Sequence, residues 1–400
     1  MHITVISGLT PYKENYHGTS ALPYHLLAGR GKDVDVVLYT FNGNQLPEDK
    51  IADVAKELNI TIEKLSLPRW FVWVFRLHLL FIRLFLKYPI HHYIKLPKHV
   101  VEEIKSSHPD GIWVYGEEHS LIVNQFSEFR RVHTLPDSEA LYYHRMLGRR
   151  FVVNDWKRYW RCAAMYPKFR KMERDFDNDH SITYHLVGAD DRQFLVDMNP
   201  GIDAQFILHP HYELADGCRS DRSFHSPIRL LVAGQYNFYM KQDADAVFEM
   251  MADATDEKLK QQYVITFLGK GWEKHVSRLQ AAAWNVQQIK FAPDYVKEII
   301  RHDVQLTPIS IGTGTKGKVL DALANGLLVV GSEYALENIA VENGSSCVIY
   351  KEPSDILKIL KDITMYQAKY EKIAAIGQKQ ILTYHDRTKV AKQLFDLFNK

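Results

Sequence analysis

Residues 308–326 read PISIGTGTKGKVLDALANG, an apolar strand that runs into a glycine-rich turn and then into a helix. Glycines let backbone N–H groups approach an anion closely, and the helix N-terminus adds a favourable dipole. The turn therefore predicts a diphosphate site formed by Gly312, Thr313, Gly314, Thr315, Lys316 and Lys318. Asp321, about one turn into the helix, would accept hydrogen bonds from ribose hydroxyls. The alternative is an ordinary loop with solvated lysines, because a glycine-rich loop alone is a weak signal.

The same stretch nearly matches a different phosphate-binding loop. Gly312 and the pair Gly317-Lys318 have Walker A spacing. That motif continues with a Ser or Thr that holds Mg²⁺, whereas Val319 follows here. A P-loop also usually opens its domain, and this turn lies near the end of the second half. We therefore favour a protein that binds a nucleotide sugar over a nucleoside triphosphatase.

Outward from this stretch, apolar strands alternate with helices in both halves of the chain, which predicts an α/β fold with parallel sheets. Strands are expected at 3–6, 34–39, 110–115, 132–135, 181–186 and 205–208, and again at 229–234, 263–269, 286–291, 304–306, 327–330 and 346–350. The chain has 400 residues, and a single core stops growing at about 250–300. We expect one Rossmann-like domain at 1–212, a polar linker at 213–227, a second such domain at 228–380, and a C-terminal helix at 381–400 that packs back on the first.

Composition excludes several classes of protein. The formal net charge is +2, so the whole chain does not look like a nucleic-acid binder. Cys162, Cys218 and Cys347 are far apart and form no CxxC pair, which argues against a disulfide framework or a structural zinc site and fits a reducing compartment. The opening MHITVISG lacks the features of a signal peptide and predicts a buried strand. We therefore expect a cytoplasmic protein.

Residues 67–98 form a dense apolar segment without an acidic residue. Arginines inside it, and Pro89 at its end, argue against a transmembrane helix. Arg69, Arg76 and Arg83 are seven apart and would share one helical face. Another face would carry Trp70, Trp73, Leu77, Phe81 and Leu84. Two interpretations remain open: a buried helix with a few solvated arginines, and a helix that docks on an anionic membrane surface.

The second half resembles the donor-binding domain of retaining GT-B glycosyltransferases of family 4, also called group 1. The resemblance rests on LVAG at 231–234 with Lys241 in the following loop, FLGKG at 267–271, IKFAPD at 289–294, DVQLTP at 303–308 and the block at 312–326. The first half matches more loosely, through HGTS at 17–20 and an Asp-Ser element in LPDSE at 135–139. Many family members carry two glutamates eight residues apart. Here the second position is Asp321 and the first is not acidic, so the backbone of the glycine turn must take its place.

The resemblance implies a GT-B architecture, in which two Rossmann-like domains with parallel sheets face a central cleft. Residues 1–212 would then bind the acceptor and residues 228–380 the nucleotide sugar. A hexose-type sugar would pass from a nucleoside-diphosphate donor to a glycan or lipid-linked acceptor, with retention of configuration and without a cofactor or metal. Lys241 would assist at the diphosphate, and Gly18 would let the first loop close on the phosphates. The family also suggests cell-surface polysaccharide assembly. The apolar and basic residues of 67–98 add the expectation of a cytoplasmic protein that can be peripheral on the cytoplasmic face of the membrane.

Candidate catalytic residues lie near the ends of first-half strands. His119, His133 and Asp137 could each position an acceptor hydroxyl or the donor sugar, and Asp137 is favoured because it belongs to the Asp-Ser element. For the histidines, a structural role is the alternative. Glu117 and Glu118 are adjacent, and neighbouring strand residues point to opposite faces, so we do not expect them to act as an acid–base couple.

Two other functions remain open. The first is a non-catalytic GT-B protein that binds a nucleotide or a partner, which the missing glutamate favours and the glycine–lysine loop opposes. The second is a sugar-nucleotide epimerase on the same fold, which would release or epimerise its sugar without any acceptor.

Overall fold

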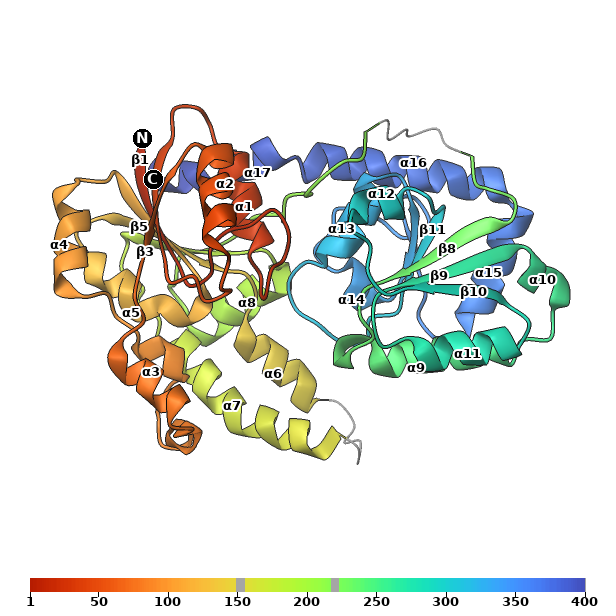
Figure 1. The fold of residues 1–400 in the computed structure, drawn as a ribbon, viewed down its shortest axis with the longest axis horizontal. Helices are drawn as coiled ribbons and strands as arrows, with labels where there is room; N and C mark the ends of the chain where they lie inside the picture. The colour runs from red at the N-terminus through yellow and green to blue at the C-terminus, as the bar shows by residue number, and fades with distance from the viewer. Residues whose placement is uncertain (149–154, 217–222, 400) are drawn as a thin grey trace. The chain divides into compact units, whose positions relative to one another are not determined.

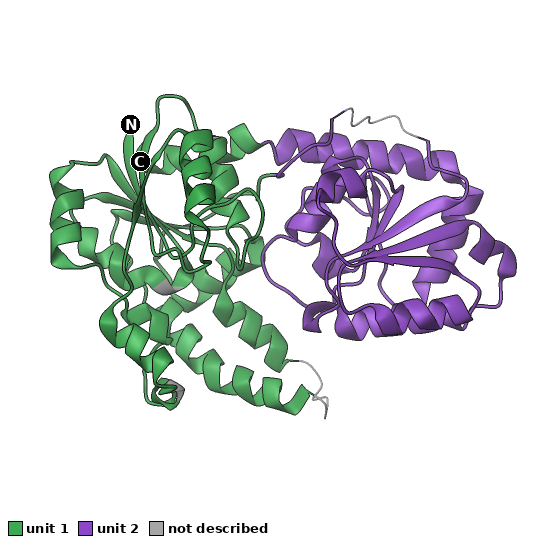
Figure 2. Ribbon diagram, in the orientation of Figure 1, with its two compact units in different colours: residues 1–210, 387–400 green, residues 211–386 purple. Residues whose placement is uncertain are grey.

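The computed structural model describes residues 1–148, 155–216 and 223–399. It divides the chain into two compact units, which Figure 2 colours separately. Unit 1 comprises Met1–Pro210 with Arg387–Lys400, and unit 2 comprises His211–Asp386. Cys218 lies outside the described residues, whereas Cys162 and Cys347 are buried free thiols.

Unit 1 is built on a parallel sheet in the order β3-β2-β1-β4-β5-β6-β7 (Figure 1). Its strands are β1 (His2–Ser7), β2 (Asp35–Thr40), β3 (Thr61–Lys64), β4 (Gly111–Tyr115), β5 (Arg130–Leu135), β6 (Ile182–Leu186) and β7 (Ala204–Phe206). Helices cover both faces of such a sheet, so its central strands read as continuous apolar runs. In β4, GIWVY, every residue is buried.

The helices of unit 1 are α1 (Ala21–Ala28), α2 (Glu48–Leu58), α3 (Arg69–Arg76), α4 (Lys98–Ser106), α5 (Ser120–Val123), α6 (Glu139–Leu147), α7 (Trp156–Arg174), α8 (Ala189–Met198) and α17 (Arg387–Phe395). Short 3-10 turns complete it: η1 (Leu80–Leu84), η2 (Ile90–Tyr93), η3 (Glu117–His119), η4 (Asn124–Phe126) and η6 (Asp396–Asn399). The chain returns to this unit through α17, whose Val390, Leu394 and Phe395 join the same apolar core as Ile3 and Trp113. Arg130 Nε donates to the carbonyl of Leu397 at 3.1 Å.

Unit 2 repeats the pattern with a parallel sheet in the order β10-β9-β8-β11-β12-β13. Its strands are β8 (Ile228–Ala233), β9 (Tyr263–Leu268), β10 (Asn285–Ile289), β11 (Val304–Thr307), β12 (Leu328–Gly331) and β13 (Val348–Ile349). Its helices are α9 (Phe238–Ala252), α10 (Glu257–Gln261), α11 (Glu273–Ala281), α12 (Tyr295–Ile299), α13 (Gly317–Ala324), α14 (Glu333–Leu336), α15 (Asp355–Met365) and α16 (Gln367–Tyr384).

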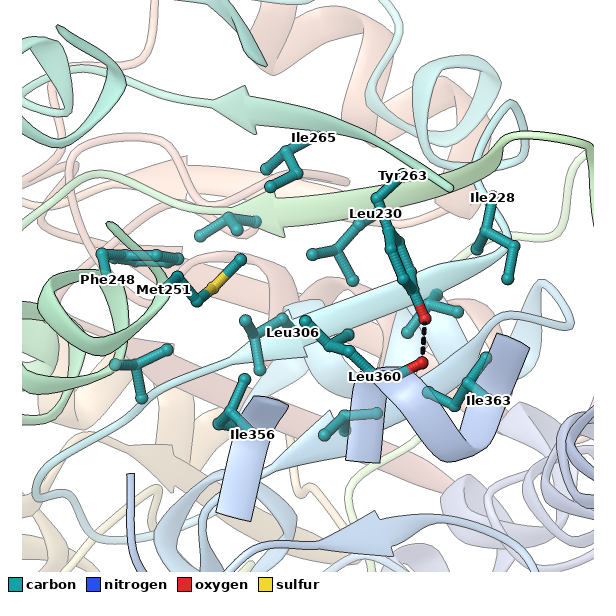
Figure 3. Packing of buried hydrophobic residues seen from close by; sticks show 14 of the residues in the cluster. Ile228, Leu230, Phe248, Met251, Tyr263, Ile265, Leu306, Ile356, Leu360 and Ile363 are labelled. Carbon is teal, nitrogen blue, oxygen red and sulfur yellow. Dashed lines mark hydrogen bonds between the residues drawn. The ribbon is translucent and has the colours of Figure 1, made fainter. Parts of the chain in front are cut away.

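The core of unit 2 lies between its sheet and the helices that cover it. Figure 3 shows Leu230, Ile265 and Leu306 from the strands packed near Phe248 of α9 and Leu360 of α15. The hydroxyl of Tyr263 donates to the carbonyl of Leu360 at 2.7 Å, so this buried polar atom has a partner. The prediction of two Rossmann-like domains with parallel sheets is confirmed.

The prediction of one helix through residues 67–98 is wrong. α3 ends at Arg76, and His78 adopts a left-handed φ of 53°, which stops helical continuation. The chain then forms only the two 3-10 turns η1 and η2. The shared face of Arg69, Arg76 and Arg83 therefore does not exist as predicted. The buried alternative also fails, because Phe71 is the only buried residue of α3.

None of the helices in the described part of the chain combines the length and apolarity that crossing a membrane requires.

Candidate functional site

Each sheet has a switch point, where neighbouring strands are joined to the rest of the chain in opposite directions along the sheet. In parallel α/β sheets, ligands bind at such points, outside the carboxyl ends of the strands. In unit 2 the switch point lies between β8 and β11, and in unit 1 between β1 and β4. The loop that the sequence singled out, between β11 and α13, therefore lies at the switch point of unit 2.

The loops that leave β8, β9 and β11 are tied together at this edge. Ser310 N donates to the carbonyl of Tyr239 at 2.7 Å, and Trp272 Nε1 donates to the carbonyl of Gly234 at 2.7 Å. Gly269 has a φ of 145°, and a Cβ on it would lie 2.2 Å from the Gly234 oxygen. Any side chain at Gly269 would thus push the loop after β8 out of place.

Lys318 brings its charge to the loop after β8. The residue as a whole has an exposed surface, whereas its ammonium end is surrounded by protein: Nζ lies 5.6 Å from the ring centroid of Tyr295 and 3.8 Å from where a Cβ on Gly234 would stand. Burial lowers the pKa of the Lys318 ammonium, and the charge of Asp321 opposes that shift. An anion bound here would raise the pKa of the ammonium again, because a nearby negative charge favours the charged form.

Tyr295 and Asp321 complete this cluster. Asp321 is buried in α13, and burial together with its charge raises the pKa of Tyr295. The hydroxyl of Tyr295 is enclosed and has no hydrogen-bond partner among the described residues. Buried hydroxyls normally have a partner, so one left without it is consistent with a polar ligand at this position.

Lys316 has a different position from Lys318. Its Nζ donates to the carbonyls of Thr313 at 2.9 Å and Gly314 at 3.1 Å, and lies 3.6 Å from Glu337 Oε2. Asn338 Nδ2 also donates to the Gly314 carbonyl, at 3.1 Å. Lys316 therefore braces its own loop, and Glu337 with Asn338, which follow α14, hold that loop from outside.

The remaining predicted donor residues lie around the same edge. Gly312 packs against Lys316, since a Cβ on it would lie 2.8 Å from the lysine Cε. Thr315 directly precedes Lys316, the N-cap residue of α13. Lys241 is in the first turn of α9, where its N–H donates to the carbonyl of Asn237 at 3.0 Å. Its side chain makes no hydrogen bond or ion pair with other described residues.

Unit 1 contains a pocket of about 460 Å³ at its own switch point. Residues that follow β1, β2, β4 and β5 line it, and α3 closes one side with Phe71 and Phe75. His119 and Asp137 both line this pocket, so the structure brings two of the three predicted catalytic residues together. Thr19 lines it as well, directly after Gly18, whose φ is 148°.

The imidazole of His119 packs against two glycines at the ends of β1 and β4. A Cβ on Gly8 would lie 2.6 Å from its Nε2, and one on Gly116, whose φ is 119°, would lie 2.9 Å from its Cδ2. The ring is therefore placed by backbone that only glycine can provide here.

His133 lies behind the pocket rather than in it. Its side chain is fully buried in β5, and its Nε2 donates to the carbonyl of Gly116 at 2.7 Å. Burial, opposed by that hydrogen bond, lowers the pKa of His133 to about 3. The ring is thus neutral near pH 7 and fixes the end of β4 against which His119 packs.

A second feature of the pocket was not expected. Glu117 lines it, and its carboxyl group is hydrogen-bonded to that of Glu173, a fully buried residue of α7. Burial raises the pKa of Glu173, while hydrogen bonds with Glu117, Ala140 and Ser138 oppose the shift. Two carboxyl groups in direct hydrogen-bond contact share a proton, since two charges so close repel strongly.

The N-terminus of α6 holds this carboxyl pair. Glu139 N donates to Glu117 Oε2 at 3.3 Å, and Ala140 N donates to Glu173 Oε1 at 2.7 Å. Ser138 Oγ donates to Glu173 Oε2 at 2.7 Å and accepts from Leu141 N at 3.0 Å. The first-turn N–H groups of a helix need such partners, and the helix dipole favours negative charge there.

Sequence reasoning missed Glu117, Tyr295 and Glu337. Glu117 was set aside together with Glu118, but its partner is Glu173, which is 56 positions away in the sequence and is brought near by α7. Tyr295 follows the IKFAPD segment directly, and that adjacency was the available signal. Nothing in the sequence marks Glu337.

Within the described ranges, His, Cys, Asp and Glu side chains form no group of three or more that could hold a metal ion.

Comparison with known families gives one match. Residues 248–396 match the family model described as glycosyl transferase-like, which covers less than half of the chain. The chain has no match among curated proteins.

Solved structures resemble the chain over nearly its whole length. Anabaena HepE in complex with UDP gives a TM-score of 0.65 at 10% identity, covering 100% of both chains. Sucrose-phosphate synthase from Thermosynechococcus elongatus gives 0.64 at 12% identity, covering 100% of this chain and 98% of that one. WaaG, a glycosyltransferase involved in lipopolysaccharide biosynthesis, gives 0.60 at 11% identity, covering 99% of each. These likenesses show a GT-B fold, and with the family match they support a glycosyltransferase.

Proposed function

We propose that this chain is a retaining glycosyltransferase that moves a hexose-type sugar from a nucleoside-diphosphate donor to a glycan or lipid-linked acceptor. Unit 2 binds the donor and unit 1 binds the acceptor. The observation that carries the proposal is the meeting of Lys318, Tyr295 and Asp321 with the loop after β8, at the switch point of the sheet of unit 2.

On the donor side, the diphosphate lies at the N-terminus of α13. Lys318 and the backbone N–H groups of the turn at 314–317 receive the charge that develops on the leaving phosphate oxygens. Preorganised donors of this kind lower the barrier because they need no reorganisation as the bond breaks. Lys316 keeps the turn in shape, and Asp321 or Tyr295 receives the ribose. In the proposed mechanism, the reaction needs no metal.

On the acceptor side, the hydroxyl that receives the sugar lies in the pocket of unit 1. His119, Asp137 and Glu117 are the polar side chains that can orient it. His133 acts only through the backbone of Gly116 and is a positioning residue. The complexes of HepE with UDP and UDP-glucose make a uridine donor the first to test. Assembly of a cell-surface polysaccharide in the cytoplasm is the role we propose for the product.

The test is thermal unfolding with UDP, GDP, dTDP and CMP, each with and without EDTA. A ligand that binds only the folded state at about one hundred times its Kd stabilises the protein by about 2.7 kcal/mol. We expect one nucleoside diphosphate to raise the Tm and EDTA to leave that rise unchanged. A rise that EDTA abolishes would contradict metal independence, and no rise with any nucleotide would favour a non-catalytic protein.

The nucleotide that binds then identifies the donor sugar to test. Incubation with the matching nucleotide sugar and no acceptor separates the transferase from an epimerase. Rapid epimerisation or sugar release without acceptor would contradict glycosyl transfer as the main activity.

A further inference from the structure

The exposed apolar side chains of this protein are concentrated in one part of unit 1. Eight of the large ones lie in residues 70–85 and two more are Trp156 and Trp160, against eight in all the rest of the described chain. Leu84 is 69% exposed, Phe85 82% and Trp160 62%. Monomeric soluble proteins rarely expose apolar side chains so densely, and such patches mark interaction sites.

The two segments meet at the C-terminal part of α7. Lys168 Nζ of α7 donates to the carbonyl of Leu84 at 3.3 Å and also to that of Leu86. Tyr88 Oη donates to Asp175 Oδ2 at 2.7 Å, just past the end of α7. Figure 1 shows α3 and α7 at the same end of unit 1. We call residues 69–87 and 156–171 the apolar–basic face.

The charge of this face is of one sign. Residues 67–98 contain no acidic residue, and neither do residues 156–172, which carry Lys157, Arg158, Arg161, Lys168, Arg170 and Lys171. Arg69, Arg76 and Arg161 form no ion pair within the described part of the chain. The guanidinium of Arg76 lies 5.9 Å from the Trp73 ring centroid, and Lys157 Nζ lies 5.8 Å from that of Trp156. Aromatic rings beside cations suit a surface where hydrocarbon meets negative charge.

We propose that the apolar–basic face docks on an anionic lipid bilayer, with its aromatic and leucine side chains in the acyl boundary and its basic side chains at the headgroups. A second copy of this chain is disfavoured because it would bring two faces of the same positive sign together. A nucleic acid would leave Leu84 and Phe85 without an apolar partner.

The pocket of unit 1 connects to this face through α3. Phe71 and Phe75 line the pocket, while Trp70 and Trp73 of the same helix are exposed. A bilayer beneath α3 would therefore bring lipid next to the pocket. If the pocket binds the acceptor, which rests on the proposed function, docking favours a lipid-linked acceptor over a free glycan.

Co-sedimentation of the full chain with vesicles tests the docking. We expect binding to mixed phosphatidylglycerol–phosphatidylcholine vesicles at low salt, much weaker binding to phosphatidylcholine alone, and partial release at high salt. Each basic residue near an anionic surface changes the partition coefficient about fivefold, so Arg69→Gln with Arg76→Gln should lower it about twenty-fivefold. Trp73→Ser with Phe85→Ser should lower it at unchanged charge.

Lys372→Gln with Lys379→Gln is the matched control, since it removes the same charge from α16 of unit 2, where both lysines are exposed. An unchanged Tm in every variant keeps the comparison free of misfolding. Equal losses in control and face variants, or no binding to anionic vesicles, would overturn the proposal. Concentration-dependent self-association that the face variants abolish, without vesicle binding, would assign the face to a second copy instead. Nucleotide-induced Tm shifts, measured on the same samples, test donor binding separately from membrane docking. Either proposal can therefore fail while the other is confirmed.

Discussion

Lys318 holds an ammonium group in surroundings that lower its pKa, over the ring of Tyr295, whose hydroxyl has no partner in the described chain. Lys318→Met should keep the packing over Tyr295 and remove the charge. Hydrogen bonds to charged groups contribute about 1.5–3 kcal/mol, so the Kd for the nucleoside diphosphate should rise about tenfold to hundredfold, by calorimetry, with little change in Tm. Lys297→Met, in the same helix as Tyr295, is the control. Equal affinity in wild type and Lys318→Met would remove Lys318 from the site.

The same lysine predicts how donor binding depends on pH. In the free protein the pKa of Lys318 is lowered, and a bound diphosphate would raise it. At a pH near the lowered pKa, the protein should therefore take up protons when it binds the diphosphate. Affinity should therefore decrease with rising pH, and titrations in buffers of different ionisation enthalpy should report the uptake. No uptake in wild type, or equal uptake in Lys318→Met, would contradict this coupling.

Glu173 predicts a pH dependence of stability. Its folded-state pKa lies above the ordinary value, so the native state keeps a proton that the unfolded chain releases. The contribution of Glu173 to the free energy of unfolding is then fully present below the ordinary glutamate pKa and is lost as the pH rises through the raised one. Glu173→Gln should make the free energy of unfolding fall less with rising pH, which is measured by comparing Tm at acidic and alkaline pH. Glu102→Gln, an exposed residue of α4, should leave the decline as in wild type.

Helix α6 depends on its first turn more than its sequence indicates. Ser138 caps it and also donates to buried Glu173, so Ser138→Ala removes a cap and leaves a carboxyl group short of a donor. The expected loss is about 1–2 kcal/mol of stability, seen as a lower Tm. Ser354→Ala at the N-cap of α15, where the side chain makes no capping bond, should change little. Equal effects of the two substitutions would show that the capping bond contributes nothing.

Among the elements, the buried parallel strands could be predicted and the peripheral ones could not. Every strand expected from the sequence overlaps a strand of the structure, because continuous apolar runs such as LLVA and ITFL leave few alternatives. β3, TIEK, was missed because it is short and mostly exposed at the sheet edge. α7 was missed because its sequence has no clear apolar stripe and contains Pro167. Residues 67–98 looked helical throughout because periodicity does not reveal the left-handed turn at His78.

The whole molecule separates its two candidate sites into two units with separate cores. Hydrogen exchange should therefore show nucleotide protection at residues 234–237 and 308–318 of unit 2. The strand-end pocket of unit 1 should change less than those loops. Protection limited to the pocket would reverse the assignment of donor and acceptor.

At this scale the sequence predicted more of the donor loop than of the acceptor pocket. The donor loop is one continuous stretch from strand to helix, so its residues meet through local structure. The pocket is assembled from the ends of four strands and from α3. The pairing of Glu117 with Glu173 needs α6 and α7 to pack first, a long-range arrangement that spacing along the chain does not reveal.

Unit 1 is assembled from both ends of the chain, and that has a consequence for synthesis on the ribosome. Val390, Leu394 and Phe395 fill the core formed by residues that emerge from the exit tunnel hundreds of codons earlier. During translation, unit 2 can complete its sheet while the first-made unit still has an open apolar groove where α17 belongs. A nonsense mutation just before Arg387 would therefore damage mainly the half of the protein made first, and the truncated product would expose a surface that chaperones and proteases recognise.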